Sequence, residues 1–343
     1  MPVEIPAEVR IPAGAALPAF RSTADDEAPA VVVGPDGIPA PVQASAATGE
    51  PVIVVPRKSR AGRDLPAAIA VGVAMLVLVL VGLLVYPVAF VVIVTAFTVV
   101  GVWEVGRALQ IRGITLPWLP VLMGSVALPA SAYFSGAEGL LFAFVVTAAA
   151  LLVYRCLDPA EGSAKSIFAG IFVLAWIPFL ISFALVILRG STGPTTGLTA
   201  DVTAIGSGAM LVAVTLLLVV ANDTFGYLLG AFFGKHPMAP KISPKKSWEG
   251  FAGSIGGAMI VAILCATLLL HLPWWAGIVL AVGLVTASTA GDLAESMVKR
   301  ELGIKDMSSI LPGHGGVMDR LDSILFAAPM AFILFSLLGA LPA

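Results

Sequence analysis

The sequence predicts an all-α protein that crosses a membrane several times and is preceded by an irregular tail. Of its 343 residues, 59% are hydrophobic and 12% are charged, whereas about 25% of the residues in an ordinary soluble domain are charged. Long apolar runs recur along the chain. Each could span a bilayer, whose hydrocarbon core of about 30 Å needs roughly 20 apolar residues per helix. Lys and Arg gather in alternate connections between these runs, as in multi-pass proteins.

Residues 1–64 are predicted to form a disordered cytoplasmic tail. They are rich in Pro and Ala and show neither a helical nor a strand period. Such a segment cannot bury enough apolar surface to become ordered. The N-terminus also lacks a short basic segment followed at once by an apolar core, which argues against a secretory signal.

We expect about nine transmembrane helices, at residues 65–86, 87–106, 116–134, 138–155, 166–189, 207–233, 250–271, 273–298 and 321–341. Pro87 and Pro273 fall between consecutive spans. Because the residue before a proline avoids the helical conformation, both prolines predict helical hairpins. The membrane part is divided into the N-terminal and middle helices, 65–206, and a C-terminal catalytic region, 207–343.

The positive charges predict the orientation. One alternating set of segments holds Arg57, Lys58, Arg60, Arg63, Arg107, Arg112, Arg155, Lys165, Lys235, Lys241, Lys245, Lys246, Lys299, Arg300, Lys305 and Arg320. The other set holds Arg189 alone. Since Lys and Arg concentrate in cytoplasmic loops, the first set should face the cytoplasm. The N-terminus is then cytoplasmic, as are the two informative loops, 234–250 and 299–320.

Composition also argues against nucleic-acid binding and against structures held by cysteines. The net charge of -2 gives no basic surface for a nucleic acid, so none is expected as a partner. Cys156 and Cys265 are the only cysteines, which argues against a disulfide framework or a zinc site.

The segment from Gly291 to Asp322 carries the strongest chemical signal. At 3.6 residues per turn, Asp292, then Glu295 or Ser296, and then Lys299 share one face of the eighth span. Asp292 stands at the end of an apolar run, and an ionisable group at membrane depth is a candidate for function. The plainer alternative is an interfacial Asp that ends the span.

A glycine-rich stretch follows, reading Pro312-Gly313-His314-Gly315-Gly316. Its glycines can take positive φ and turn backbone N–H groups toward an anion. Around it, Asp319 and Asp322 accompany a set of cations: Lys299, Arg300, Lys305 and Arg320. Such a set suits a Mg²⁺-nucleotide, because carboxylates bind the metal and cations bind phosphate oxygens. The alternative is a loop that only reverses the chain. His314 is interpreted as a loop or phosphate contact.

The loop KISPKKSWEG, residues 241–250, is a second candidate. Ser243 and Pro244 look like a helix N-cap and first helical position. This cap would direct backbone donors, together with Lys245 and Lys246, toward an anion. An ordinary positive-inside anchor is the alternative.

Asn222 and Asp223 form a polar pair inside an apolar run. They should face a polar cavity rather than lipid. The alternative is a hydrogen bond between two buried helices.

These residues together resemble the CDP-diacylglycerol synthase, or phosphatidate cytidylyltransferase, family. The match to its signature runs through Ser296, Lys299-Arg300, Lys305-Asp306, the stretch from Pro312 to Gly316, Asp319-Arg320 and Asp322. The Asn222-Asp223 pair and the SPKKSWEG loop are similar to that family's upstream motifs. The resemblance covers roughly residues 65–341.

The resemblance implies a membrane homodimer that transfers CMP from CTP to phosphatidic acid, in the plasma (inner) membrane among its lipids. It implies a two-metal centre with Mg²⁺ and a second cation such as K⁺. Asp292 and Asp319 would be the principal metal ligands and, with Lys299 and Arg300, the catalytic residues. The substrate contacts would be Asn222, Asp223, Lys245, Lys246, Ser247, Ser296, Lys305, His314 and Arg320.

Two other functions compete with this interpretation. Another Mg²⁺-dependent membrane transferase or kinase acting on a lipid phosphate or polyprenol would use similar aspartates. A transporter would also have many spans and an intramembrane Asp223. However, transporters place their charges near the bilayer midplane, often in repeated halves, whereas these charges cluster in loops and no repeat is visible.

Overall fold

The computed structural model describes residues 42–44, 51–53, 65–157, 162–189, 207–308, 310 and 315–341. The chain divides into two units, Met1–Gly62 and Arg63–Ala343. In the first unit, the described residues form two short strands, β1 (Val42–Ala44) and β2 (Pro51–Ile53), paired antiparallel. The rest of the predicted tail lies outside the described residues, so its disorder stays a prediction.

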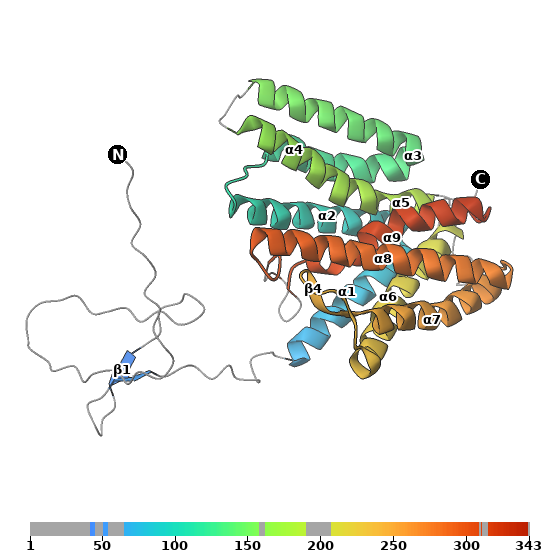
Figure 1. Cartoon of the computed structure of the whole chain (residues 1–343). Helices are drawn as coiled ribbons and strands as arrows, with labels where there is room; N and C mark the ends of the chain where they lie inside the picture. The colour runs from blue at the N-terminus through green and yellow to red at the C-terminus, as the bar shows by residue number, and fades with distance from the viewer. Residues whose placement is uncertain are drawn as a thin grey trace, which may run out of the picture. The chain divides into compact units, whose positions relative to one another are not determined.

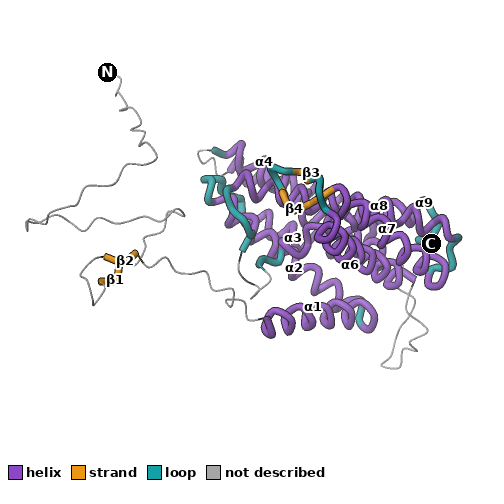
Figure 2. The backbone as a smooth tube through the Cα atoms, turned by 60° about the horizontal axis from the view of Figure 1, so that its bottom comes forward, coloured by secondary structure: helices purple, strands orange, loops and turns teal. Residues whose placement is uncertain are grey.

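The described part of the second unit is a bundle of apolar helices with one small β-hairpin (Figures 1 and 2). The helices are α1 (Leu65–Val85), α2 (Pro87–Gln110), α3 (Trp118–Leu157), α4 (Ser163–Leu174), α5 (Leu180–Arg189), α6 (Ser207–Phe233), α7 (Trp248–Leu264), α8 (Trp274–Leu302) and α9 (Met318–Leu337). The π-helical turn η1 (Ala175–Phe179) joins α4 to α5, and η3 (Cys265–Leu269) extends α7. Strands β3 (Pro237–Ala239) and β4 (Ser243–Ser247) form the hairpin between α6 and α7. The predicted all-α, multi-pass membrane fold is confirmed.

In the described chain, seven helical segments are long and apolar enough to cross a membrane, whereas the sequence suggested about nine. One reason is that α3 is counted as one segment although it contains two of the predicted spans, 116–134 and 138–155. Its backbone leaves the helical conformation at Gly136, where φ is +73°, and only glycine adopts such a φ readily. Gly124 before this break lies against Thr147 after it, so α3 folds back on itself. The number of spans stays a prediction.

The two hairpins predicted from proline are confirmed. Pro87 occupies the start of α2, directly after α1 ends at Val85. Pro273 immediately precedes α8. A Cβ on Gly277 would lie 2.5 Å from Ile263 Cα, so α7 and α8 meet backbone to backbone.

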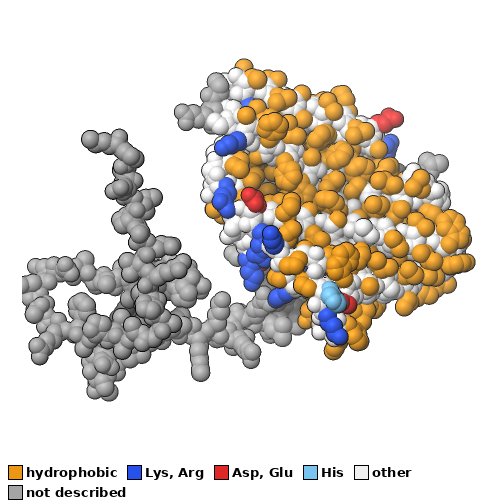
Figure 3. Space-filling model, in the orientation of Figure 1, with side chains coloured by type: hydrophobic (Ala, Val, Ile, Leu, Met, Phe, Trp, Pro, Cys, Tyr) orange, Lys and Arg blue, Asp and Glu red, His pale blue; other side chains and the backbone are white. Residues whose placement is uncertain are grey.

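Polar contacts join several connections at one end of the bundle. Arg112 Nη2 donates to Glu301 O at 2.6 Å, which ties α2 to the end of α8. Arg300 Nε donates to Ile242 O at 3.2 Å, which brings the β-hairpin to the same end. Figure 3 shows Lys and Arg side chains gathered along one edge of the largely apolar surface. We call this the basic end of the bundle.

Candidate functional site

The last turns of α8 carry one wall of the site. Ser296 Oγ donates to Asp292 Oδ1 at 3.3 Å, and Lys299 Nζ donates to Glu295 Oε2 at 2.5 Å. These i, i+4 contacts confirm the predicted shared face. The helix ends at Gly303, which takes the left-handed conformation (φ +75°) that favours glycine.

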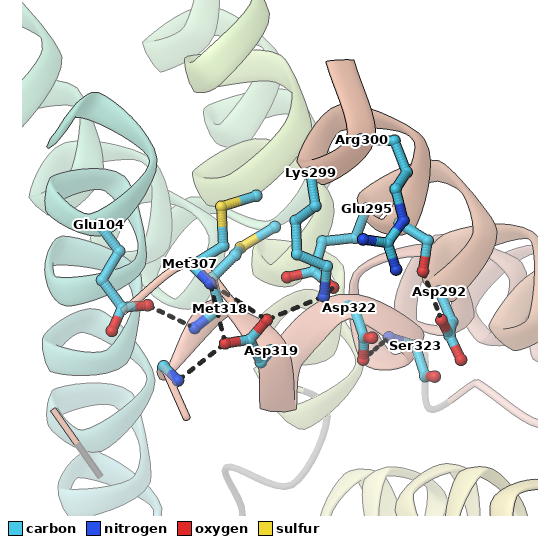
Figure 4. A network of polar contacts seen from close by, with 12 residues as sticks. Glu104, Asp292, Glu295, Lys299, Arg300, Met307, Met318, Asp319, Asp322 and Ser323 are labelled. Carbon is cyan, nitrogen blue, oxygen red and sulfur yellow. Dashed lines mark hydrogen bonds and ion pairs between the residues drawn. The ribbon is translucent and has the colours of Figure 1, made fainter. Parts of the chain in front are cut away.

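Asp319, in the first turn of α9, is surrounded by donors (Figure 4). Its Oδ1 accepts from Lys299 Nζ at 2.8 Å. Its Oδ2 accepts from the backbone N–H of Gly316 at 2.8 Å and of Met307 at 3.2 Å. Only 7% of the side chain is exposed. The side chain of Asp319 therefore joins α8, the loop after α8, and α9.

Asp322 lies near the two carboxylates that the family resemblance assigned to a metal. In Figure 4 it lies between Asp319 and Asp292. It interacts electrostatically with Asp292 and with Glu295, and Glu295 also interacts with Asp319. The acidic side chains thus form a continuous series from α8 to α9.

The β3–β4 hairpin adds a basic side chain to this series. Lys246 Nζ lies 2.6 Å from Asp292 Oδ2. The N-cap that the sequence placed at Ser243 is wrong, because Ser243–Ser247 is an extended strand paired with β3. The cap is Ser247, whose Oγ accepts from Gly250 N at 3.1 Å at the start of α7.

A cavity of about 300 Å³ opens between the hairpin, α6, α7 and α8. Its polar lining residues are Asn222, Asp223, Tyr227, Lys245, Lys246, Ser247, Ser254, Thr289 and Asp292. Asn222 is 6% exposed, and its Oδ1 has no hydrogen-bond partner among the described residues. A buried acceptor without a partner is costly, so a ligand donor would be stabilising here. The cavity brings together three of the predicted motifs.

Comparison with known proteins gives the family. Residues 66–338 match the family described as Cytidylyltransferase family. The chain belongs to this family. It is 41% identical to the phosphatidate cytidylyltransferase of Mycobacterium bovis over 82% of this chain and 91% of that protein. It is 37% identical to the Mycobacterium leprae enzyme of the same name, over 81% of this chain and 90% of that enzyme. Phosphatidate cytidylyltransferase 5, chloroplastic, from Arabidopsis thaliana is 36% identical over 57% of this chain and 50% of its own length.

Not every residue predicted for this cytidylyltransferase site points into the cavity. Arg300 is bonded to the hairpin backbone. Lys305 and Arg320 are exposed on the loop and on the first turn of α9. His314 lies outside the described residues. Their predicted contacts with substrate stay predictions.

Two acidic residues were missed in the sequence. Glu104 on α2 is fully buried and accepts hydrogen bonds from the start of α9. Glu295 is also fully buried. Helical periodicity placed it on the face shared by Asp292 and Lys299 but predicted no role for it. Each is an ionisable residue within an apolar helix. An ionisable residue in such a helix is a candidate functional group by default. The reason that singled out Asp292 therefore applies to Glu104 and Glu295 as well.

The site's chemistry fits the Mg²⁺ that the family resemblance implies. Glu295 Oε1 is buried without a hydrogen-bond partner in the described structure, and 30% of the Asp292 side chain is exposed. Within the described ranges, no group of three or more His, Cys, Asp or Glu side chains is arranged to hold a metal by itself. Mg²⁺ commonly uses one or two carboxylates and completes its shell with nucleotide phosphates and water. The residues therefore suit a metal that binds with its nucleotide.

Proposed function

We propose that this protein transfers CMP from CTP to phosphatidic acid, forming CDP-diacylglycerol and pyrophosphate. The observation that carries the proposal is the cavity in which Lys246 pairs with Asp292 in a membrane-embedded cytidylyltransferase. A cation and a carboxylate at the head of apolar helices suit a reaction between a water-soluble nucleotide and a membrane lipid. The names of the relatives support the same substrates.

In this reaction a phosphate oxygen of the lipid attacks the α-phosphorus of CTP. The bond from that phosphorus to the bridging oxygen of the β-phosphate breaks, and pyrophosphate leaves. Both reactants are anions, so their charges must be offset before the two oxygens can align. We assign this task to Lys245 and Lys246, which line the cavity. Phosphate oxygens would then compete with Asp292 for Lys246.

The remaining polar groups hold the site in shape. Lys299 bridges Glu295 and Asp319 and offsets their charge. Ser296 donates to Asp292 and orients it. Asp292 and Asp319 would hold Mg²⁺, which would polarise the phosphoryl oxygens when bound. A second cation such as K⁺ would use the same acidic series.

Asn222 supplies a buried acceptor for a substrate donor, while Asp223 and Ser247 complete the polar lining of the cavity. Arg300, Lys305, His314 and Arg320 are proposed to contact phosphates at the mouth.

We further propose that the basic end faces the cytoplasm of a cell whose plasma membrane holds the protein as a homodimer. The charge distribution supports the orientation, because Lys and Arg are retained on the cytoplasmic side. This orientation gives the cavity access to CTP. The homodimer rests on the family resemblance.

The test uses purified protein with phosphatidic acid and CTP labelled at either the α- or the γ-phosphorus. CMP transfer should place the α-label in the lipid and the γ-label in pyrophosphate. A lipid kinase would instead place the γ-label in the lipid. That outcome, or the absence of both labels from the lipid, would overturn the proposal.

A further inference from the structure

Helix α9 begins without a cap of its own. Its N-cap residue, Val317, makes no side-chain capping bond. The first N–H groups of a helix have no partner within the helix and need an external acceptor. Here the acceptor comes from a distant part of the chain. Glu104 on α2 accepts from Val317 N at 2.9 Å and from Met318 N at 2.7 Å.

Glu104 also binds the loop that follows α8. Ser308 Oγ donates to Glu104 Oε1 at 2.5 Å. The neighbouring Met307 donates its backbone N–H to Asp319. Glu104 and Asp319 together therefore fix residues 307–308 and 316–318.

Gly316 stands between these two carboxylates. A Cβ at this position would lie 2.8 Å from Glu104 Oε2 and 3.0 Å from Asp319 Oδ2. Both distances are too short for an unperturbed contact, so the two acidic side chains approach the same backbone segment closely. Gly316 also donates its N–H to Asp319. A shift of this segment would turn the Asp319 side chain.

The chemistry of Glu104 favours a role in orientation. The side chain is fully buried, and burying a carboxylate costs free energy unless donors compensate it. The Ser308 hydroxyl, the two backbone N–H groups and the positive end of the helix dipole supply that compensation. A pair of apolar residues would join α2 to α9 at lower cost. A charged cap adds direction, since it fixes where each backbone N–H points.

We propose that Glu104 is a positioning residue for the transferase reaction. It does not touch substrate. It holds the backbone from Gly316 to Met318, and through it the orientation of Asp319 toward Lys299. This inference rests on the proposed function, in which Asp319 belongs to the reaction centre.

Glu104→Gln tests the proposal with little change of shape. The amide has one acceptor oxygen, so one of the two backbone N–H groups of α9 faces an NH₂ group instead. We expect kcat for CMP transfer to fall about 10- to 100-fold, as on loss of other groups that orient a catalytic residue. The KM for CTP should stay within about twofold, because no substrate contact is lost.

Thr98→Val is the matched control. Thr98 is also fully buried on α2, and among the described residues its hydroxyl bonds only its own helix, at Val94 O. Its replacement should leave kcat unchanged. If Glu104→Gln fails to fold, Ser308→Ala removes one donor and keeps the carboxylate, and kcat should fall by about threefold or more.

A double-mutant cycle separates orientation from general stability. If Glu104 acts through Asp319, adding Glu104→Gln to Asp319→Asn should lower kcat by no more than about twofold further, since coupled residues are not additive. A full additional loss, or normal kcat in Glu104→Gln, would overturn the inference. Normal kcat in Asp319→Asn would instead refute the role of Asp319 in the proposed function.

Discussion

The surroundings of Asp292 and Asp319 differ, although both carboxylates lie on the same acidic series. Asp292 is 30% exposed, lines a cavity and contacts two side chains, those of Lys246 and Ser296. Asp319 is 7% exposed and accepts from backbone groups on both sides of the loop as well as from Lys299. The first region can exchange a protein contact for a substrate contact. The second holds backbone segments together. We call them the open and the closed region.

Removing the negative charge of Asp292 or of Asp319 should have the largest effect on activity. Asp292→Asn and Asp319→Asn should each lower kcat by about 100-fold or more, because charge stabilisation by a bound metal is worth several kcal/mol. Only Asp319→Asn should also lower the thermal unfolding temperature, since Asn leaves buried donors without an acceptor, at about 1–3 kcal/mol each. Activity and unfolding of the purified variants test both points.

Asp306→Asn is the control for these variants. Asp306 is exposed in the loop after α8 and should lose much less activity. Near-normal, Mg²⁺-dependent activity in Asp319→Asn would remove that residue from the reaction centre. The same result in Asp292→Asn would refute the two-aspartate mechanism.

A smaller effect should follow from adding a methyl group to the closed region. In Gly316→Ala, the new Cβ would meet Glu104 Oε2 at 2.8 Å and Asp319 Oδ2 at 3.0 Å. The two carboxylates must move apart, and we expect kcat to fall about tenfold, as when an orienting group is displaced. Gly256→Ala on α7 has no neighbour within 4 Å of its new Cβ and should be neutral. Equal activities for the two variants would show that the closed region tolerates movement.

The open region was easier to predict from sequence than the closed one. In the open region, Asp292 follows from helical periodicity and Lys246 from its place in a basic loop. The contacts of Glu104 join α2 to α9, more than 200 residues apart in sequence, and no local pattern specifies such a pairing. Even so, a lone Glu in an apolar run was a usable signal.

The cap at Ser243 was predicted wrongly for a related reason. Ser followed by Pro is a good local start for a helix, but it is also compatible with a short edge strand. Pairing with β3 decided between them and moved the cap to Ser247. At Gly136, by contrast, the predicted break between the spans 116–134 and 138–155 is present, because its positive φ ends one helix before the next begins.

The orientation of the bundle in the membrane can be tested by labelling its two ends. In a background lacking Cys156 and Cys265, Glu138→Cys should react with an impermeant thiol reagent in intact cells. Glu138 is exposed near the Gly136 turn, which lies against Arg189. Asp306→Cys should react only after permeabilisation. The reverse pattern would place the basic end away from CTP.

In the proposed reaction, the open region binds the nucleotide and the closed region sets the geometry of the reacting groups. Single-turnover CMP transfer at varied CTP concentration separates the two. Lys245→Ala combined with Lys246→Ala should raise the CTP concentration that gives the half-maximal rate about tenfold or more. A tenfold change corresponds to a loss of only about 1.4 kcal/mol of binding free energy. Gly316→Ala should lower the maximal rate and leave that concentration within about twofold. An unchanged CTP dependence in a well-folded double lysine variant would contradict the account.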